Sequence, residues 1–336
     1  MSEREPVRPA VRPNRERYPL PPVPDGWYGM GPADALAPGE VRALRRLDRE
    51  LVAFRDEAGT VRLFDAHCPH LGAHLGVGGR VAGDGIRCPF HGWRFDGEGR
   101  CVEVPRLDRD PPDARLVRHP VREIDGHLFA WHHARGEPPS WEPPVLREGD
   151  PARWTPWIRE RHEVRTHVQD MAENILDRAH FVHVHDMEEA AAPRFEIRFD
   201  GPAMTVEQNL KMTHAAGREV ASRTTNHGPG LSLTRVDVGQ VHSVTFIAHT
   251  PIDADRVAFE LAFSMHRLAD PEATAAIERI NRELVNAQAL QDMPIWEHKI
   301  YRAKPILTAL DGPVHAFRRW YRQFHSTLPG AEGEGA

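Results

Sequence analysis

Two short motifs each pair a cysteine with a histidine. Cys68-Pro69-His70 is followed, after an interval of 17 residues, by Cys88-Pro89-Phe90-His91. Thiolate sulfur and imidazole nitrogen both bind transition metals, and zinc accepts a set of two cysteines and two histidines. Zinc fingers place both cysteines in one loop and both histidines in the other, whereas each motif here supplies one of each. This arrangement favours a two-iron centre in which one iron takes the cysteines and the other takes the histidines.

The two motifs, with Gly92 and Trp93 after the second, resemble those of the Rieske iron–sulfur family. The resemblance implies a [2Fe–2S] cluster whose histidine ligands raise its reduction potential above that of all-cysteine clusters. Zinc remains the alternative at this point. The ligands that the resemblance implies are Cys68, His70, Cys88 and His91.

Three neighbouring residues compete for roles around these motifs. His67 and His74 flank the first motif, and we interpret both as polar loop residues rather than ligands. Cys101 has no further cysteine within the domain with which to form the disulfide of respiratory-complex Rieske proteins. This indicates the ferredoxin-like branch of the family.

A second group of potential metal ligands lies in the second half of the chain. The pattern Asp177-x-x-His180-x₄-His185 supplies one carboxylate and two imidazoles, with Asp177 and His180 on one helical face. Non-haem iron that activates oxygen uses two histidines and one carboxylate on one face of the metal, and Asp292 is a carboxylate near the end of a predicted helix. His183 is an alternative to His185, because it lies one helical turn from His180. Without the Rieske motifs, a solvated helix surface would be the better interpretation.

Together, the two groups resemble the oxygenase component of Rieske non-haem iron oxygenases over roughly residues 25–300. The resemblance implies that His180, His185 and Asp292 bind a mononuclear Fe(II). It also implies that Asp177 links the two metal centres between neighbouring subunits. Asn174, one turn before Asp177, is a candidate for the same site, with a helix-surface amide as the alternative. Electrons would come from an NAD(P)H-dependent reductase or a ferredoxin. Members of this family assemble head to tail in closed rings, commonly homotrimers.

Two further segments narrow the resemblance within the family. Gly26-Trp27-Tyr28 and the run from Gln291 to Lys299 are most similar to 3-ketosteroid 9α-hydroxylase oxygenases and cholesterol 7-desaturases. That branch implies O₂-dependent oxidation of an apolar, steroid-like or sterol-like substrate by hydroxylation or desaturation. One alternative is an aromatic O-demethylase or ring hydroxylase of the same family, and another is a Rieske electron carrier without oxygenase activity.

The elements that position these groups are expected to form an α+β protein. Short apolar runs that alternate with turn signals, such as Asp125-Gly126, predict an all-β Rieske domain over residues 25–137. A proline-rich connector over 138–155 should separate it from the mononuclear iron catalytic domain over 156–325. Strand-like runs in that second domain predict an antiparallel sheet, followed by a long C-terminal helix.

The sequence also predicts the structure of the two ends of the chain and of the long helix. Residues 1–24 are rich in proline and arginine and should form an extended arm without a helix, and 326–336 a flexible tail. Pro294 should kink or end the long helix just after Asp292. Apolar residues at helical spacing place one stripe along that helix. The stripe consists of Ile277, Ile280, Leu284, Ala287 and Leu290.

Composition excludes several classes of protein. The 336 residues carry a formal net charge of −6, so no global positive field is available to hold nucleic acid. No apolar stretch is long enough to span a bilayer, which argues against a membrane-embedded enzyme. Three cysteines are too few for a disulfide scaffold, and the N-terminus lacks the apolar core of a secretory signal. A cytoplasmic location is expected.

Overall fold

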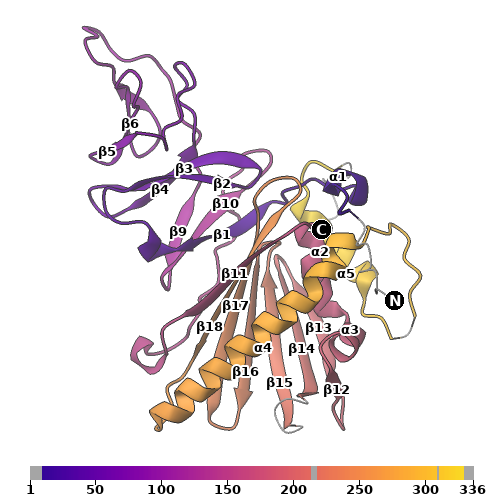
Figure 1. The fold of residues 1–336 in the computed structure, drawn as a ribbon. Helices are drawn as coiled ribbons and strands as arrows, with labels where there is room; N and C mark the ends of the chain where they lie inside the picture. The colour runs from indigo at the N-terminus through magenta and orange to yellow at the C-terminus, as the bar shows by residue number, and fades with distance from the viewer. Residues whose placement is uncertain (1–9, 213–217, 309, 329–336) are drawn as a thin grey trace, which may run out of the picture.

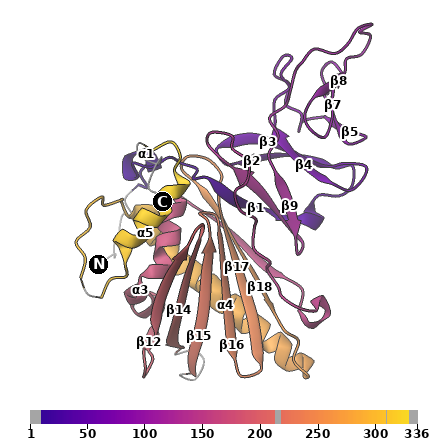
Figure 2. The ribbon, with the colours of Figure 1, turned by 180° about the vertical axis from the view of Figure 1, so that it is seen from behind.

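The computed structural model describes residues 10–212, 218–308 and 310–328 and shows an α+β protein of two domains (Figure 1). The N-terminal domain consists of short antiparallel strands and rests on one end of a large antiparallel sheet. The view from behind shows that the long helix crosses only one face of that sheet (Figure 2). The fold class predicted from the sequence is confirmed.

Three small sheets make up the N-terminal domain. The first contains β2 (Val41–Arg46), β3 (Arg49–Arg55) and β4 (Val61–Asp65), and the second contains β1 (Gly26–Pro32), β10 (His127–His132) and β9 (Val121–Ile124), with the short helix η1 (Ala33–Ala35) after β1. The third contains β5 (Arg80–Ala82), β6 (Gly85–Arg87), β7 (Arg94–Phe95) and β8 (Cys101–Glu103). Asp125 and Gly126, between β9 and β10, have φ angles of 51° and 76°, the left-handed conformation that a two-residue hairpin requires.

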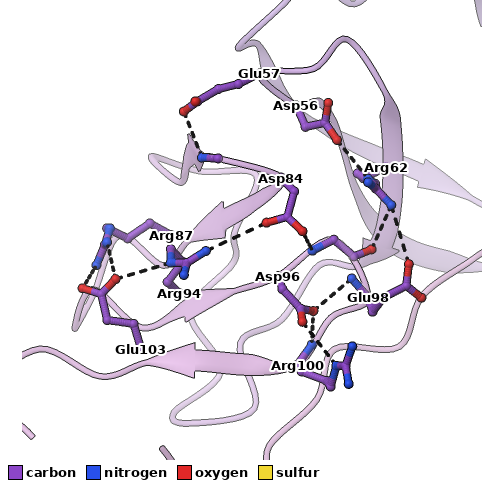
Figure 3. A network of polar contacts seen from close by, with 12 residues as sticks. Asp56, Glu57, Arg62, Asp84, Arg87, Arg94, Asp96, Glu98, Arg100 and Glu103 are labelled. Carbon is purple, nitrogen blue, oxygen red and sulfur yellow. Dashed lines mark hydrogen bonds and ion pairs between the residues drawn. The ribbon is translucent and has the colours of Figure 1, made fainter.

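A network of charged side chains attaches the third sheet to the rest of the domain (Figure 3). Arg62 on β4 donates to the buried carboxylate of Asp56 at 3.1 Å and to the carbonyl oxygen of Gly97, beyond β7, at 3.3 Å. Within the sheet, Arg87 on β6 donates to Glu103 on β8 at 2.8 Å. These contacts hold the sheet that carries the second cysteine–histidine motif.

Eight antiparallel strands form the sheet of the C-terminal domain in the order β11-β18-β17-β16-β15-β14-β12, with β13 paired to β14. The strands are β11 (Ile158–Val164), β12 (Met187–Glu189), β13 (Phe195–Asp200), β14 (Ala203–Met212), β15 (Arg218–His227), β16 (Leu231–Val238), β17 (Val241–Pro251) and β18 (Val257–Met265). Phe259 and Leu261 of β18 pack against the long helix α4 (Pro271–His298), whereas Ala262 packs on the opposite face. The sheet therefore separates α4 from the N-terminal domain.

Shorter helices cover the same face as α4. The segment after β11 forms α2 (Val168–Glu173), η3 (Asn174–Leu176) and α3 (Arg178–His183), and the C-terminal end forms α5 (Val314–Tyr321) and η5 (Arg322–Phe324). Leu176 packs with Val206 of β14 and with Phe317 of α5 in one buried cluster. Residues 168–185 thus lie between the sheet and the C-terminal elements.

The long helix differs from what its sequence pattern indicates in two ways. Pro294 lies inside α4 and does not end it. The turn beyond it is stabilised from outside the helix, because the Arg17 guanidinium donates to the carbonyl oxygens of Trp296 at 2.8 Å and Glu297 at 3.0 Å. The apolar stripe also does not mark the buried side of the helix. Ile280 and Leu290 are 57% and 51% exposed, and the buried positions in this half of the helix include Ala289, Asp292 and Trp296.

The N-terminal arm is anchored to the catalytic domain. It contains a one-turn helix, α1 (Asn14–Arg17), so the prediction that no helix forms here was wrong. Pro13 precedes the first helical residue and therefore costs the helix no hydrogen bond. Asn14 is buried and donates to the carbonyl oxygen of Thr166 at 2.7 Å. Residues 1–9, and most of the predicted tail, lie outside the described residues.

The proline-rich connector packs closely and includes the short helix η2 (Pro151–Arg153). Trp27 of β1 donates from its indole nitrogen to the carbonyl oxygen of Trp141 at 2.7 Å. Leu146 is completely buried in the core formed by the N-terminal domain and the sheet. The connector is thus part of the joint between the two domains.

Candidate metal centres

The two cysteine–histidine motifs form a matching pair of loops. In the first, the amide of Gly72 donates to the carbonyl oxygen of Cys68 at 2.9 Å, and in the second, the amide of Gly92 donates to that of Cys88 at 3.1 Å. The two glycines have φ angles of 75° and 73°, a conformation that glycine adopts without strain. The same local turn therefore presents each motif.

The four predicted cluster ligands are arranged with the sulfur atoms inside and the imidazoles outside. Cys68 and Cys88 are 3% and 4% exposed, whereas His70 and His91 are exposed and their ring centroids lie 4.8 Å apart. Burial raises the pKa of the Cys68 thiol to about 11, and the neighbouring Cys88 acts in the same direction. Bound iron would stabilise the thiolates that burial disfavours. The donor set and its burial fit a cluster with two cysteines on the inner iron and two histidines on the outer iron.

Trp93 supports this site in a way that the sequence reasoning did not anticipate. Its ring stacks on His70 with 4.4 Å between centroids and 10° between planes. The stacking fixes the orientation of the imidazole. The flanking His67 lies 3.3 Å from Glu50 and its ring contacts that of His74, which agrees with polar loop roles for both flanking histidines.

His180, His185 and Asp292 come together from distant parts of the chain. His180 lies in α3, His185 follows that helix, and Asp292 projects from the buried side of α4. One ligand atom from each residue lies within 4.8 Å of the other two. His185 and Asp292 are 5% and 8% exposed, so the group is largely shielded from water. Two imidazoles and one carboxylate at this spacing can hold a single transition-metal ion.

Asn174 joins two members of this group. Its amide nitrogen lies 3.0 Å from Nε2 of His180 and donates to Oδ2 of Asp292 at 3.1 Å. Of the two interpretations that the sequence left open for Asn174, these contacts favour a place at the site.

Both histidine rings are held from behind by hydrogen bonds at Nδ1. Nδ1 of His185 lies 2.9 Å from Oε1 of Gln291, and Nδ1 of His180 lies 2.5 Å from the carbonyl oxygen of Asp177. These bonds make Nε2 the ring nitrogen on the side of the ligand group, where Nε2 of His180 also contacts the Asn174 amide, and such partners fix the tautomer and the ring orientation. The sequence reasoning assigned no role to Gln291, and its position beside Asp292 was the only available signal.

The surroundings shift the two imidazoles in opposite directions. Burial lowers the pKa of His180 below its usual value. Burial acts in the same direction on His185, but hydrogen bonds with Asp292 and Gln291 outweigh it and raise the pKa of that ring. Metal binding requires the neutral imidazole at both positions. The number of protons released when a metal binds would therefore differ between the two rings.

Asp177 has a role that the sequence reasoning did not assign. It is the N-cap of α3, where Oδ1 accepts a hydrogen bond from the backbone amide of His180 at 3.1 Å. The His180 ring is held by the backbone carbonyl of Asp177 and not by its carboxylate. Among the described residues, no hydrogen bond reaches Oδ2 of Asp177. That oxygen can accept a hydrogen bond from another molecule.

His183, the alternative ligand, is exposed at the end of α3 and does not belong to the group of three. The structure therefore favours His185 as the partner of His180.

None of the helices within the described residues combines the length and the apolar character that a membrane crossing requires.

Two family models match the chain, one for each domain. Residues 26–123 match the family model of the Rieske [2Fe-2S] domain, and residues 130–325 match that of the 3-ketosteroid 9alpha-hydroxylase C-terminal domain. A cholesterol 7-desaturase of Ciona intestinalis is 31% identical over 347 residues, covering 94% of this chain and 73% of that protein. A probable 3-ketosteroid-9-alpha-monooxygenase, oxygenase component, of Rhodococcus rhodochrous is 33% identical over 321 residues, covering 89% and 79%.

Solved structures share the same fold. Dicamba monooxygenase bound to dicamba superimposes with a TM-score of 0.70 at 18% identity, covering 90% of this chain and 97% of that one. NdmA of Pseudomonas putida CBB5 gives a TM-score of 0.71 at 19% identity, covering 88% and 89%. The two-domain arrangement is thus common to these enzymes.

Proposed function

The chain belongs to the 3-ketosteroid 9α-hydroxylase family of Rieske oxygenases, and from this premise we propose that it is the terminal oxygenase of a monooxygenase system acting on a steroid or sterol. The oxidation uses O₂ and electrons from an NAD(P)H-dependent reductase or a ferredoxin. The observation that carries the proposal is the group of His180, His185 and Asp292, because an electron carrier would need no second metal site. The proposed setting is the cytoplasm, where cysteine thiols stay reduced.

The geometry described above supports an assignment of residues to the two cofactors. Cys68, Cys88, His70 and His91 would bind the [2Fe–2S] cluster, and His180, His185 and Asp292 would bind a mononuclear Fe(II). When bound, the cluster supplies single electrons and the mononuclear iron supplies the open coordination positions for O₂ chemistry. Asn174 orients the Asp292 carboxylate, and the burial of that carboxylate excludes water from the ligand group.

The position of the cluster loops supports an assembly in which neighbouring chains complete one another. Figure 1 shows the cluster-binding loops around β5 and β6 at the outer end of the N-terminal domain, on the opposite side of the molecule from α3. Leu71, Val77 and Phe90 are 66%, 69% and 60% exposed around the cluster histidines. Leu290 and Ile295 of α4 are 51% and 46% exposed on either side of Asp292. We place these two apolar surfaces against each other in a head-to-tail homotrimer.

Asp177 provides the link between the centres in such an assembly. Its Oδ1 is used by the α3 cap, so Oδ2 is the acceptor available to a cluster histidine of the neighbouring chain. The backbone carbonyl of the same residue already holds the His180 ring. One residue would then orient an imidazole at each metal centre.

The metal content of anaerobically purified protein tests the proposal. We expect about three irons and two sulfides per chain, with a Rieske-type EPR signal after reduction by dithionite. Asp292→Ala should lose one iron and keep the cluster signal, whereas His183→Ala, the matched control, should keep all three. Two irons after Fe(II) reconstitution would instead indicate an electron carrier. Zinc without sulfide would contradict the Rieske assignment.

Oxygen uptake tests the substrate class separately. With a compatible reductase, a 3-ketosteroid or cholesterol should stimulate oxygen consumption and yield one oxidised steroid for each O₂ consumed. A methoxybenzoate serves as the comparison, because the sequence left an aromatic O-demethylase open. Turnover of the methoxybenzoate without turnover of either steroid would replace the steroid assignment with the demethylase.

A further inference from the structure

A pocket of about 430 Å³ lies where the N-terminal domain rests on the catalytic sheet. Strands β1 to β4 contribute one side, and β11 and β18 contribute the other. The volume is within the range of sites that bind small molecules. The proposed oxygenase chemistry makes no use of this pocket.

The pocket is separate from the mononuclear metal site. Successive side chains of a strand point to opposite faces of a sheet. On β18, Phe259 and Leu261 pack against α4, whereas Ala258 and Glu260 line the pocket. The sheet therefore stands between the pocket and Asp292 on α4.

The wall formed by the N-terminal domain is apolar and only partly covered. Met30, Leu44, Val61 and Val121 are partly buried, and they pack on a core that contains Leu63. All five residues line the pocket. Such a surface favours an apolar ligand, since roughly 25 cal/mol is gained for each Å² of apolar surface removed from water.

The opposite wall and the rim carry excess positive charge. Four arginines and two glutamates line the pocket. Arg42 and Arg161 have carboxylate partners outside it, namely Glu40 and Glu163. Arg46 and Arg159, in contrast, lie within 4.0 Å of no carboxylate among the described residues. Arg159 donates from Nε to Nε2 of His127 at 3.4 Å, and Arg46 donates to the carbonyl oxygen of Arg45 at 2.7 Å, so each guanidinium keeps further N–H donors for a ligand.

Glu260 interacts electrostatically with Arg46, Arg159 and Arg161 but forms no ion pair within 4.0 Å with any of them, so it offsets only part of their charge. Its Oε1 is buried and has no hydrogen-bond partner among the described residues. Burial raises the pKa of the Glu260 carboxyl, and burial likewise lowers the pKa of Arg46 to about 10. Both groups are thus poorly solvated, and an anion beside Arg46 would stabilise its charged form.

We propose that this pocket binds an apolar molecule of steroid or fatty-acid size that ends in a carboxylate. The apolar part lies on the wall of Leu44 and Val61, and the carboxylate pairs with Arg46 and Arg159. Because the ligand contacts both domains, it ties the Rieske domain to the catalytic sheet. Binding should therefore raise the melting temperature of the enzyme.

Calorimetric titration of the whole holoenzyme tests this proposal with deoxycholate and with laurate, each beside its methyl ester. Two acids are used because one carries rings and the other a flexible chain, which identifies the kind of apolar body that fits. We expect at least one acid to bind and its neutral ester to bind at least ten-fold more weakly. Ester binding as tight as acid binding, or no binding of either acid at millimolar concentration, would overturn the proposal.

Variants locate the binding. Leu44→Trp, which fills the pocket, should abolish it, and the double variant Arg46→Glu/Arg159→Glu should weaken it at least ten-fold. Arg109→Glu/Arg115→Glu, at two exposed arginines outside the pocket, makes the same charge change and should bind normally. Val61→Trp is the second filling variant if Leu44→Trp does not fold, judged by its cluster absorption. Binding that survives both the filling variant and the double variant takes place elsewhere, for instance at the metal site, and would refute the assignment.

Discussion

The guanidinium of Arg17 donates a hydrogen bond to the carbonyl oxygen of Trp296 at 2.8 Å, which joins the N-terminal arm to the last turn of α4. Trp296 lies one helical turn beyond Asp292, the carboxylate of the mononuclear metal site. The same side chain donates to the carbonyl oxygens of Glu297 and Lys299. A buried cation at a helix C-terminus also interacts favourably with the helix dipole. The arm thus holds the end of the helix that positions Asp292.

Arg17→Ala should lower the free energy of unfolding by about 3 kcal/mol, because it leaves buried carbonyl groups without charged donors. It should also weaken the binding of the mononuclear iron while leaving the [2Fe–2S] cluster in place. Urea unfolding and iron content measure the two effects. Arg15→Ala, at an exposed position in the same short helix, is the control. Equal stability of the two variants would show that the arm does not support α4.

Asp177→Asn should leave both metals bound, because asparagine remains a good N-cap for α3. It removes the charge and one acceptor from the position that we place between the metal centres. Oxidation of the reduced cluster in single-turnover experiments with substrate should slow by about 10- to 100-fold. Asp177→Ala removes both the cap and the link. Comparison of the two variants therefore separates the effect of losing the helix cap from the effect of losing the link. Unchanged single-turnover rates in the asparagine variant would exclude the link.

Gln291→Ala should lower the affinity for the mononuclear iron by about 10- to 100-fold, since the His185 ring loses the partner that fixes its orientation. Metal titration of the iron-depleted enzyme, followed by activity and by direct iron analysis, measures the change. Gln288→Ala, one turn earlier on α4, should bind iron normally. If both variants bind iron equally well, the His185 ring is fixed by other contacts.

Stability should fall as the pH falls below about 6.5. Burial lowers the pKa of His167 from 6.5 to about 4 and that of His325 to about 3. Between its folded-state pKa and pH 6.5, each histidine binds fewer protons in the folded state than in the unfolded state. Its contribution to the free energy of unfolding is therefore at its full value above pH 6.5. That stability is lost at about 1.4 kcal/mol per pH unit as the pH falls towards 4.

His167→Asn tests this explanation, because asparagine can replace the imidazole as the N-cap of α2 without titrating. The slope of unfolding free energy against pH should decrease between pH 6.5 and 4. His315→Asn, at an exposed position, should leave the slope unchanged. A slope in His167→Asn equal to that of the wild type would assign the acid sensitivity to other groups.

Local patterns predicted the fold class and the residues that form both candidate metal centres. The Cys68 and Cys88 motifs are recognisable because their spacing is short and the turns that present them are local. The contacts of Asn174 with Asp292 and of Gln291 with His185 span 118 and 106 residues, so only the folded chain reveals them. Tertiary packing also set the rotation of α4. It buried the side that carries Asp292, although the longest apolar stripe lies elsewhere on the helix.

Asp56→Asn should release the cluster-binding sheet from the rest of the Rieske domain. Asp56 is completely buried, and its carboxylate holds the largely buried Arg62 at 3.1 Å. The asparagine can still accept the hydrogen bond from the Thr60 amide, so the variant removes mainly the charge. Loss of the buried partner leaves Arg62 with only the exposed Glu98, at 3.7 Å, which should cost about 3 kcal/mol of stability and hasten the loss of iron and sulfide in urea.

The exposed pair of Asp113 and Arg115 provides the control for this effect. The Asp113 side chain is 91% exposed, so Asp113→Asn should change neither the urea midpoint nor the cluster content. Cluster absorption and sulfide content followed against urea concentration distinguish the two variants. If Asp56→Asn retains its cluster as well as Asp113→Asn does, the network in Figure 3 is not what secures the cluster loops.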